Sequence, residues 1–134
     1  MFQLHPQLAA DTFLVGELPL SRLLMSKDGN YPWFLLVPRR PDISEIYQLS
    51  DADQQQLWQE SATLSRALMA QFQGDKLNVA ALGNMVPQLH LHHIVRFRHD
   101  GAWPAPVWGA QAAKPLPAPE AQTRISALQA ALGL

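Results

Sequence analysis

Short apolar runs interrupted by turn signals fill the first forty residues, and this pattern predicts strands. Residues 12–18 and 20–26 predict two strands separated by Pro19, and residues 27–30 (Lys-Asp-Gly-Asn) form a turn sequence typical of hairpins. Residues 33–37 are continuously apolar, which predicts a central strand covered on both faces. The connections are too short for helical crossovers, so we expect antiparallel pairing.

The middle of the chain changes to a helical period. Ser50 stands three residues before Asp53, a capping pattern that begins helices, and Gly74 is well placed to end this one. The apolar face of this helix would carry Leu57, Ser61, Leu64, Leu68 and Phe72. Residues 76–82 and 88–97 then predict two further strands, joined by a loop over residues 83–87.

The last third of the chain is different in composition. Residues 101–109 are rich in Pro and Trp, which excludes a regular helix or a central strand. A Pro/Ala linker over residues 110–119 follows, and Pro119 is suited to open a final helix. That helix would bury one stripe formed by Ile125, Leu128 and Leu132.

Together these elements predict an α+β fold with an antiparallel sheet of about five strands, one long helix and a C-terminal extension. A chain of 134 residues fits one domain better than two, and 48% hydrophobic residues suffice for a core. Within it, we assign residues 1–100 to the folded domain. Residues 101–134 form a Trp/Pro-rich segment and a C-terminal helix that pack on that domain.

Charge and composition exclude several classes of protein. The chain has 10 basic and 11 acidic residues, which argues against a nucleic-acid-binding protein. It has no cysteine, which excludes disulfides, thiolate metal ligands and cysteine catalysis. No apolar run approaches the roughly 20 residues that span a bilayer, and the N-terminus lacks a secretory pattern. We expect a cytoplasmic protein that contacts neither nucleic acid nor membrane.

The strongest chemical signal is the alternation of Gln88, His90 and His92 along one predicted strand. Alternate side chains share a face of a strand, about 7 Å apart, and polar groups there need partners. A bound phosphate would supply acceptors, and an open cleft with water would also satisfy them. Because histidine titrates near neutral pH, an uncharged ring can attack phosphorus while neighbours stabilise the phosphoryl oxygens. The sequence predicts a phosphate-handling site with His90 as its nucleophile.

Residues 83–96 (Gly-Asn-Met-Val-Pro-Gln-Leu-His-Leu-His-His-Ile-Val-Arg) resemble the signature of the histidine triad (HIT) family. The usual form of that signature is Gly-Gln-Thr/Ser-Val-x-His-φ-His-φ-His-φ-φ, where φ is an apolar residue. Residues 35–40 resemble the central strand of the family, which ends in Pro and basic residues. Residues 77–79 resemble the strand that enters the catalytic loop. The likeness covers roughly residues 10–100.

The resemblance implies a small α+β fold, a homodimer, and hydrolysis or transfer at the α-phosphate of a nucleotide conjugate. Dinucleoside polyphosphates and nucleoside phosphoramidates are the implied substrates. We expect no cofactor and no metal. It implies that His90 forms a nucleotidyl-histidine intermediate. His92 would donate a hydrogen bond to a non-bridging phosphate oxygen. The expected partner is therefore a small-molecule nucleotide.

Three residues depart from the family pattern. Gln88 stands at the first motif histidine, and it keeps the backbone carbonyl that orients the nucleophile; its amide can bind phosphate but cannot move a proton. Asn84 stands where the family has Gln, and Met85 replaces a Thr or Ser hydroxyl that serves the leaving group. Asn84 and Asn78 are further candidates for phosphate binding. Asp28 is a candidate for the ribose, although it is also a turn residue.

Several alternatives stay open. Retained binding with little or no turnover would make the chain a nucleotide-binding module, which the departures favour. The segment from Trp103 to Trp108 could be the surface of an interaction protein; we expect it to fold back near the histidine strand, to cross a dimer interface, or to pack on its own core. The histidines His90, His92 and His93 could instead form a metal site. Two imidazoles that lie two residues apart can share one ion, but a catalytic zinc site usually needs a third ligand from another part of the chain, and the sequence shows none.

Two more polar residues of the motif have less specific roles. His93 should face the opposite side of the strand from His92, where a packed histidine with one satisfied nitrogen is expected. Arg96 should hold the strand end or an acidic partner, or lie in solvent. His5 and His99 have no polar cluster around them in the sequence and should be structural or exposed.

Overall fold

The computed structural model describes residues 1–134 and has the expected α+β architecture. Five strands, three α-helices and one 3-10 helix follow one another along the chain. Their bounds are α1 (Pro6–Asp11), β1 (Thr12–Glu17), β2 (Ser21–Ser26), β3 (Trp33–Pro38), η1 (Ile46–Gln48), α2 (Asp51–Phe72), β4 (Lys76–Ala80), β5 (Leu91–Arg96) and α3 (Ala118–Leu132).

The strands form one antiparallel sheet in the order β1-β2-β3-β5-β4. The central position of β3 confirms the prediction from its continuous apolar run, and every residue from Phe34 to Pro38 is buried. β5 lies next to β3 with Leu35 opposite His92 and Phe34 opposite His93. The histidine strand therefore runs through the interior of the sheet, where both its faces are covered.

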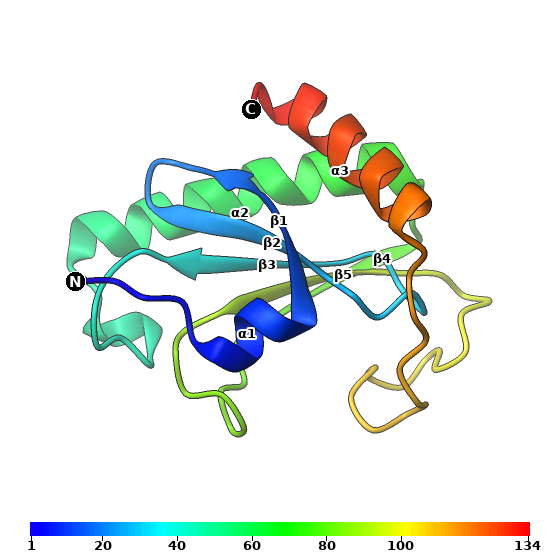
Figure 1. The fold of residues 1–134 in the computed structure, drawn as a ribbon, viewed down its shortest axis with the longest axis horizontal. Coiled ribbons are helices and arrows are strands. Elements are labelled where there is room, and N and C mark those ends of the chain that lie inside the picture. The colour runs from blue at the N-terminus through cyan, green and yellow to red at the C-terminus, as the bar shows by residue number, and fades with distance from the viewer.

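The two faces of the sheet carry different layers. The 22-residue helix α2 packs on the face that holds Leu23, Phe34 and Leu91, and α3 packs beside α2 (Figure 1). Helix α1 lies on the opposite face, where Leu8 packs on Leu24 of β2 and its neighbours. Consecutive residues of β2 thus point to separate cores, as the period of a strand requires.

Helix α2 begins where the capping pattern predicted. The Ser50 hydroxyl accepts a hydrogen bond from the Asp53 backbone N–H at 3.1 Å. The prediction that Gly74 ends the helix was wrong, because Gln73 is the residue in the left-handed conformation (φ 54°) that forms the C-cap. Gly74 is needed for a different reason. A Cβ there would collide with Cγ1 of Val95 on β5.

Two other predictions need correction. The hydrophobic pattern indicated no element before residue 12, but α1 begins at Pro6, a residue suited to the first helical turn. The predicted strand over residues 88–97 is shorter, because β5 begins only at Leu91. Gln88 and His90 therefore lie in irregular backbone before the strand, and Gln88 does not share a strand face with His92. None of the helices combines the length and hydropathy needed to cross a bilayer.

A buried arginine anchors the Trp/Pro-rich segment to the end of β5. Arg96 is 1% exposed, and its guanidinium donates to both carboxylate oxygens of Asp100, at 2.9 and 3.1 Å. It also donates to the Ala105 carbonyl at 2.8 Å and lies over the Trp103 ring. Of the roles expected for Arg96, holding an acidic partner is confirmed. The anchor directs the chain back toward His92, which lies on the same strand.

The linker that follows is fixed to the turn between β2 and β3. Asn30 Nδ2 donates to the Ala112 carbonyl at 2.9 Å, and the Lys114 backbone N–H donates to Asp28 Oδ1 at 3.2 Å. The Leu116 N–H donates to the Lys27 carbonyl at 3.1 Å. Residues 112–116 consequently lie against the hairpin turn, where they form one edge of the candidate active site.

Candidate active site

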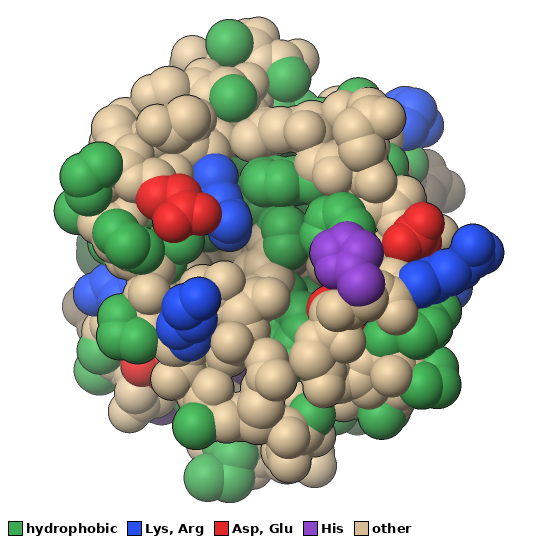
Figure 2. All heavy atoms as spheres, turned by 90° about the vertical axis from the view of Figure 1, so that its right-hand side faces the viewer, with side chains coloured by type: hydrophobic (Ala, Val, Ile, Leu, Met, Phe, Trp, Pro, Cys, Tyr) green, Lys and Arg blue, Asp and Glu red, His purple; other side chains and the backbone are tan.

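One large cavity opens on the α1 face of the sheet, with a volume of about 800 Å³. Its walls come from α1, the end of β2, residues 82–86 and residues 113–115, and His90, His92, Trp33 and Trp108 line its interior. Cavities that enclose small-molecule ligands commonly measure about 300–1,000 Å³. Figure 2 shows acidic and basic side chains interspersed on one side of the molecule. A cavity of this volume suits a ligand of nucleotide size that is held by the side chains lining the cavity.

His90 is held with one ring nitrogen fixed and the other free. Its Nδ1 lies 2.7 Å from the Gln88 carbonyl oxygen. A carbonyl can only accept, so Nδ1 carries the proton and the neutral ring keeps its lone pair on Nε2. This contact also shows that Gln88 provides the orienting backbone carbonyl that the family resemblance implied.

His92 lies directly beside His90 on the same wall. The two ring centroids are 4.7 Å apart and the rings meet edge to face. His92 Nδ1 lies 3.0 Å from the indole Nε1 of Trp33, and the Trp108 ring lies edge-on at 5.1 Å. Burial lowers the pKa of His92 to about 3, and the nearby His90 and His93 rings contribute to that lowering, so His92 is uncharged at neutral pH.

The free nitrogen of each ring reaches open space. No protein group is hydrogen-bonded to Nε2 of His90 or to Nε2 of His92. Neither atom is among the buried side-chain atoms without a partner, which are Ser21 Oγ, Tyr31 OH and Gln71 Oε1. Nε2 of His90 and Nε2 of His92 are thus both accessible from the cavity.

Of the other four predicted residues, the structure brings two to the cavity. Asn84 and Asp28 line it. Asp28 also fills its expected role in the turn, since its Oδ1 accepts from the Asn30 backbone N–H at 2.9 Å. The side-chain hydrogen bonds of Asp28 all go to Oδ1, which leaves Oδ2 for a ligand.

Gln88 and Asn78 do not line the cavity. The Gln88 side chain accepts from the His5 backbone N–H and donates to the Gln3 carbonyl, both at 2.8 Å. Asn78 Oδ1 instead accepts from Arg96 at 2.9 Å, within the buried anchor. Neither residue lines the cavity, and the Gln88 amide nitrogen already donates to Gln3, so these contacts give no support to phosphate binding by the two amides.

The role of Gln88 gives a prediction. Gln88→Ala should lower the free energy of unfolding by about 1–2 kcal/mol, because it removes two hydrogen bonds that hold the N-terminal segment. The amide proton of His5 should exchange faster with solvent in the variant. Amide hydrogen exchange and urea unfolding measure both effects. Gln122→Ala, which removes an exposed glutamine paired with Ser126, is the control; equal His5 protection in wild type and Gln88→Ala would contradict the assignment.

The cavity residues that were not predicted from the sequence include Trp33, Trp108, Lys27 and Lys114. The local pattern indicates only a buried strand at Trp33, and a turn and a linker at the two lysines. Trp108 did carry a signal, since folding back near the histidine strand was one of the three placements expected for its segment. Its contact with His92 agrees with that placement. The positions of the lysines depend on the pairing of residues 112–116 with the hairpin turn.

His93 faces the other side of β5, as expected. Its Nε2 lies 2.7 Å from the Ser61 hydroxyl of α2 and its Nδ1 lies 3.1 Å from the Leu91 carbonyl. Burial lowers the pKa of His93 to about 4, against the opposing effect of the Leu91 hydrogen bond. His93 is therefore an uncharged core residue that joins the sheet to α2.

The two low pKa values predict acid destabilisation. Below the ordinary histidine value of 6.5, the unfolded chain takes up protons that His92 and His93 in the folded chain refuse. Stability should therefore fall as pH falls from 7 to 5, by about 2 kcal/mol for each ring. Urea unfolding at the two pH values measures this. His99→Asn, at an exposed ring, should show the same pH dependence as wild type, and equal stability at pH 5 and 7 would contradict the prediction.

The polar residues of the cavity do not form a metal site. No group of three or more His, Asp or Glu side chains is arranged to share an ion. His90 Nδ1 and His92 Nδ1 are both engaged by protein groups, at 2.7 and 3.0 Å. The Nε2 atoms of the two rings are the imidazole nitrogens that this wall offers to a ligand.

Comparison with known proteins agrees with this geometry. A family model described as HIT domain matches residues 7–99. A crystal structure of a histidine triad protein from Bradyrhizobium japonicum is 53% identical, with 96% of each chain covered and a TM-score of 0.95. A histidine triad protein from Marinobacter aquaeolei VT8 is 53% identical, with 99% of this chain and 97% of that chain covered and a TM-score of 0.96.

A third solved structure, a histidine triad (HIT) protein from Sinorhizobium meliloti 1021, is 37% identical, with 96% of each chain covered and a TM-score of 0.94. A search of curated proteins found no match. The family model covers most of this chain, and the similar structures extend over nearly all of it. The chain therefore belongs to the histidine triad family.

Proposed function

We propose that this protein is a nucleotide hydrolase or transferase that acts at the α-phosphate of a nucleotide conjugate through a nucleotidyl-histidine intermediate on His90. The observation that carries the proposal is the contact between His90 Nδ1 and the Gln88 carbonyl, which leaves an accessible lone pair on Nε2. With Nδ1–H donated to that carbonyl, the uncharged ring attacks through Nε2, which carries no proton that a general base would have to remove.

The reaction proceeds in two displacements. In the first, the lone pair of His90 Nε2 forms a bond to the α-phosphorus, and the bond from phosphorus to the leaving oxygen or nitrogen breaks with its electron pair. The leaving group takes a proton from water. In the second, water attacks the same phosphorus, the phosphorus–nitrogen bond breaks, and its electrons return to Nε2. The water gives up a proton to solvent, and a nucleoside monophosphate is released.

His92 stabilises the phosphoryl group during both displacements. Its Nε2 reaches open space next to His90, so an N–H there can donate to a non-bridging oxygen. Preorganised donors of this kind act strongly in a site with little water, because they need not reorient as charge develops. Asn84 also lines the cavity and can add an amide donor, and Lys27 and Lys114 bring positive charge to its lining.

The cavity also supports the substrate class. A volume of about 800 Å³ accommodates a nucleotide together with a substantial leaving group, as in a dinucleoside polyphosphate or a phosphoramidate. Asp28 Oδ2 is available to accept from ribose hydroxyls. We include in the proposal that the chain works as a homodimer in the cytoplasm, with residues 1–100 as the HIT-like domain and residues 101–134 packing on it.

A second function is a nucleotide-binding module with little or no turnover. Met85 favours it, because this side chain is 93% exposed and offers no hydroxyl to serve a leaving group. The engaged amide of Gln88 favours it as well. Binding would then use the same cavity without either displacement.

The experiment that separates the two functions traps the intermediate. The protein is mixed with an adenosine phosphoramidate and with a dinucleoside polyphosphate, quenched at short times, digested and examined by mass spectrometry. The proposal predicts a peptide that carries His90 with one added adenylyl group, and AMP in the supernatant. Tight binding in calorimetry, without the modified peptide or AMP, would instead establish the binding module.

A further inference from the structure

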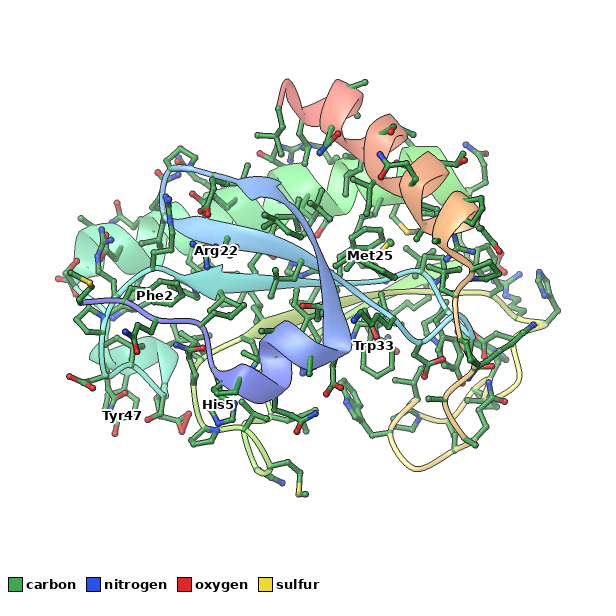
Figure 3. All side chains as sticks on the ribbon, in the orientation of Figure 1. Phe2, His5, Arg22, Met25, Trp33 and Tyr47 are labelled. Atoms are coloured by element: carbon green, nitrogen blue, oxygen red, sulfur yellow. The ribbon has the colours of Figure 1, made fainter.

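Trp33 contacts His92 through its polar edge. In the sheet, Trp33 of β3 pairs with Ile94 of β5, and Leu35 pairs with His92, so the indole lies diagonally across from the imidazole on the cavity face. Figure 3 shows Trp33 near the end of α1 and the start of β1. The indole Nε1 lies 3.0 Å from His92 Nδ1, and the ring centroids are 5.8 Å apart.

The direction of this hydrogen bond is determined by chemistry. An indole N–H can donate but cannot accept, so His92 Nδ1 must be the acceptor and must be free of a proton. An uncharged imidazole then carries its single proton on the other nitrogen. We propose that Trp33 is a positioning residue that fixes His92 in the tautomer with its proton on Nε2. This inference rests on the proposed function for its catalytic meaning.

The tautomer determines what His92 presents to a ligand. With the proton on Nε2, the ring donates to a phosphate oxygen from the side of the cavity. The opposite tautomer would direct a lone pair at that oxygen and repel it. Donation by Trp33 also opposes a second proton on Nδ1, because two N–H groups would then face each other. Trp33 thus keeps His92 both uncharged and correctly oriented as a donor.

The surroundings hold the indole in place. Tyr31 and Trp108 both contact the Trp33 ring edge-on, with centroids 6.3 and 5.9 Å away. Strand β3 brings Leu35 opposite His92, and β4 brings Ala80, so neither neighbouring strand places an ionisable partner there. The ionisable groups around His92 are His90 and His93 on its own segment and Asp11, Lys27, Asp28 and Lys114 across the cavity.

The decisive measurement uses the unmodified protein. In uniformly ¹⁵N-labelled protein, the hydrogen bond should produce a nitrogen–nitrogen coupling between Trp33 Nε1 and His92 Nδ1. A long-range ¹H–¹⁵N spectrum of the side chains should show the proton of His92 on Nε2, and the chain has only 5 histidines to assign. Absence of the coupling, or a His92 proton on Nδ1, would overturn the proposal.

A variant supplies the second test. Trp33→Phe keeps an aromatic ring but removes the donor, so the His92 ring should populate both tautomers and its pKa should rise by about half a unit to one unit. Trp58→Phe removes an exposed indole from α2 and should leave the His92 nitrogen shifts and their titration unchanged. A His92 ring that titrates and tautomerises identically in Trp33→Phe and wild type would overturn the proposal. The wild-type coupling decides the question if Trp33→Phe does not fold.

These readouts do not depend on turnover. If the coupling is present but no nucleotide conjugate is cleaved, the proposed function fails and the role of Trp33 in fixing His92 stands for binding. If cleavage is observed but the coupling is absent, the enzyme is established and the proposal for Trp33 fails. If both are present, Trp33→Phe should lower kcat more than it raises KM, because the donor matters most when charge develops on the phosphoryl oxygens.

Discussion

His90→Ala is expected to slow release of nucleoside monophosphate by about 1,000-fold or more, while nucleotide affinity changes by less than about tenfold. The reason is that the variant removes the only proposed nucleophile but keeps the cavity walls and the His92 donor. Product formation is measured by chromatography with a nucleotide-conjugate panel. Affinity for AMP is measured by calorimetry.

The control for His90→Ala is a histidine outside the site. His99 is exposed and stacks on Phe97, so His99→Ala should retain the wild-type rate. Turnover that survives in His90→Ala would show that another group attacks phosphorus and would end the proposed mechanism. Turnover that is absent from both the wild type and the variant, with intact binding, would establish the binding module.

The second large effect concerns stability. Asp100→Ala should lower the free energy of unfolding by about 3–5 kcal/mol, because it leaves the Arg96 guanidinium buried without its counter-charge. The side chains of Arg96 and Asp100 are only 2% and 5% exposed. Urea unfolding followed by circular dichroism measures the loss.

A surface ion pair of the same spacing provides the matched control for Asp100→Ala. Glu120 and Arg124 form an i,i+4 pair with side chains 52% and 20% exposed, whereas Arg96 and Asp100 form a buried i,i+4 pair. Glu120→Ala should cost no more than about 1 kcal/mol. Equal effects of the two substitutions would show that burial of the Arg96 anchor does not stabilise the fold.

Acid should weaken the same anchor, but only at low pH. Burial acts to raise the pKa of Asp100, while hydrogen bonds from Arg96 and from the backbone N–H groups of Phe97, Trp103 and Ala102 outweigh burial and lower the pKa to about 2. A carboxylate with a lowered folded pKa stabilises fully above its ordinary value near 3.8 and loses that stability as pH falls toward 2. The loss, about 2 kcal/mol, therefore follows at lower pH than the effect of His92 and His93.

Much of the fold could be predicted because the evidence for it is local. The turn at residues 27–30, the apolar run of β3 and the capping Ser50 each depend on a few neighbouring residues. The histidine motif is equally local, so a short stretch of sequence was enough to select His90 and His92, and both line the cavity. The opposite orientation of His93 followed from the two-residue period of a strand.

The contacts that the sequence could not reveal depend on residues far apart along the chain. Gln88 lies within the motif, but its amide bonds to Gln3 and His5, which no local pattern indicates. Trp33 reaches His92 only through the register between β3 and β5. The Asn78 amide serves Arg96 because β4 pairs with β5. Each is a property of the assembled sheet and not of a sequence window.

The walls of the cavity come from segments far apart in the sequence, from Leu8 to Pro115. A compound that fills the cavity contacts all these segments at once, so its binding raises the free energy of unfolding of the entire domain. At a concentration one hundred times its dissociation constant, such a compound would add about 2.7 kcal/mol of stability. Heat denaturation in the presence of a nucleotide library can thus reveal the preferred base and conjugate without any assay of chemistry.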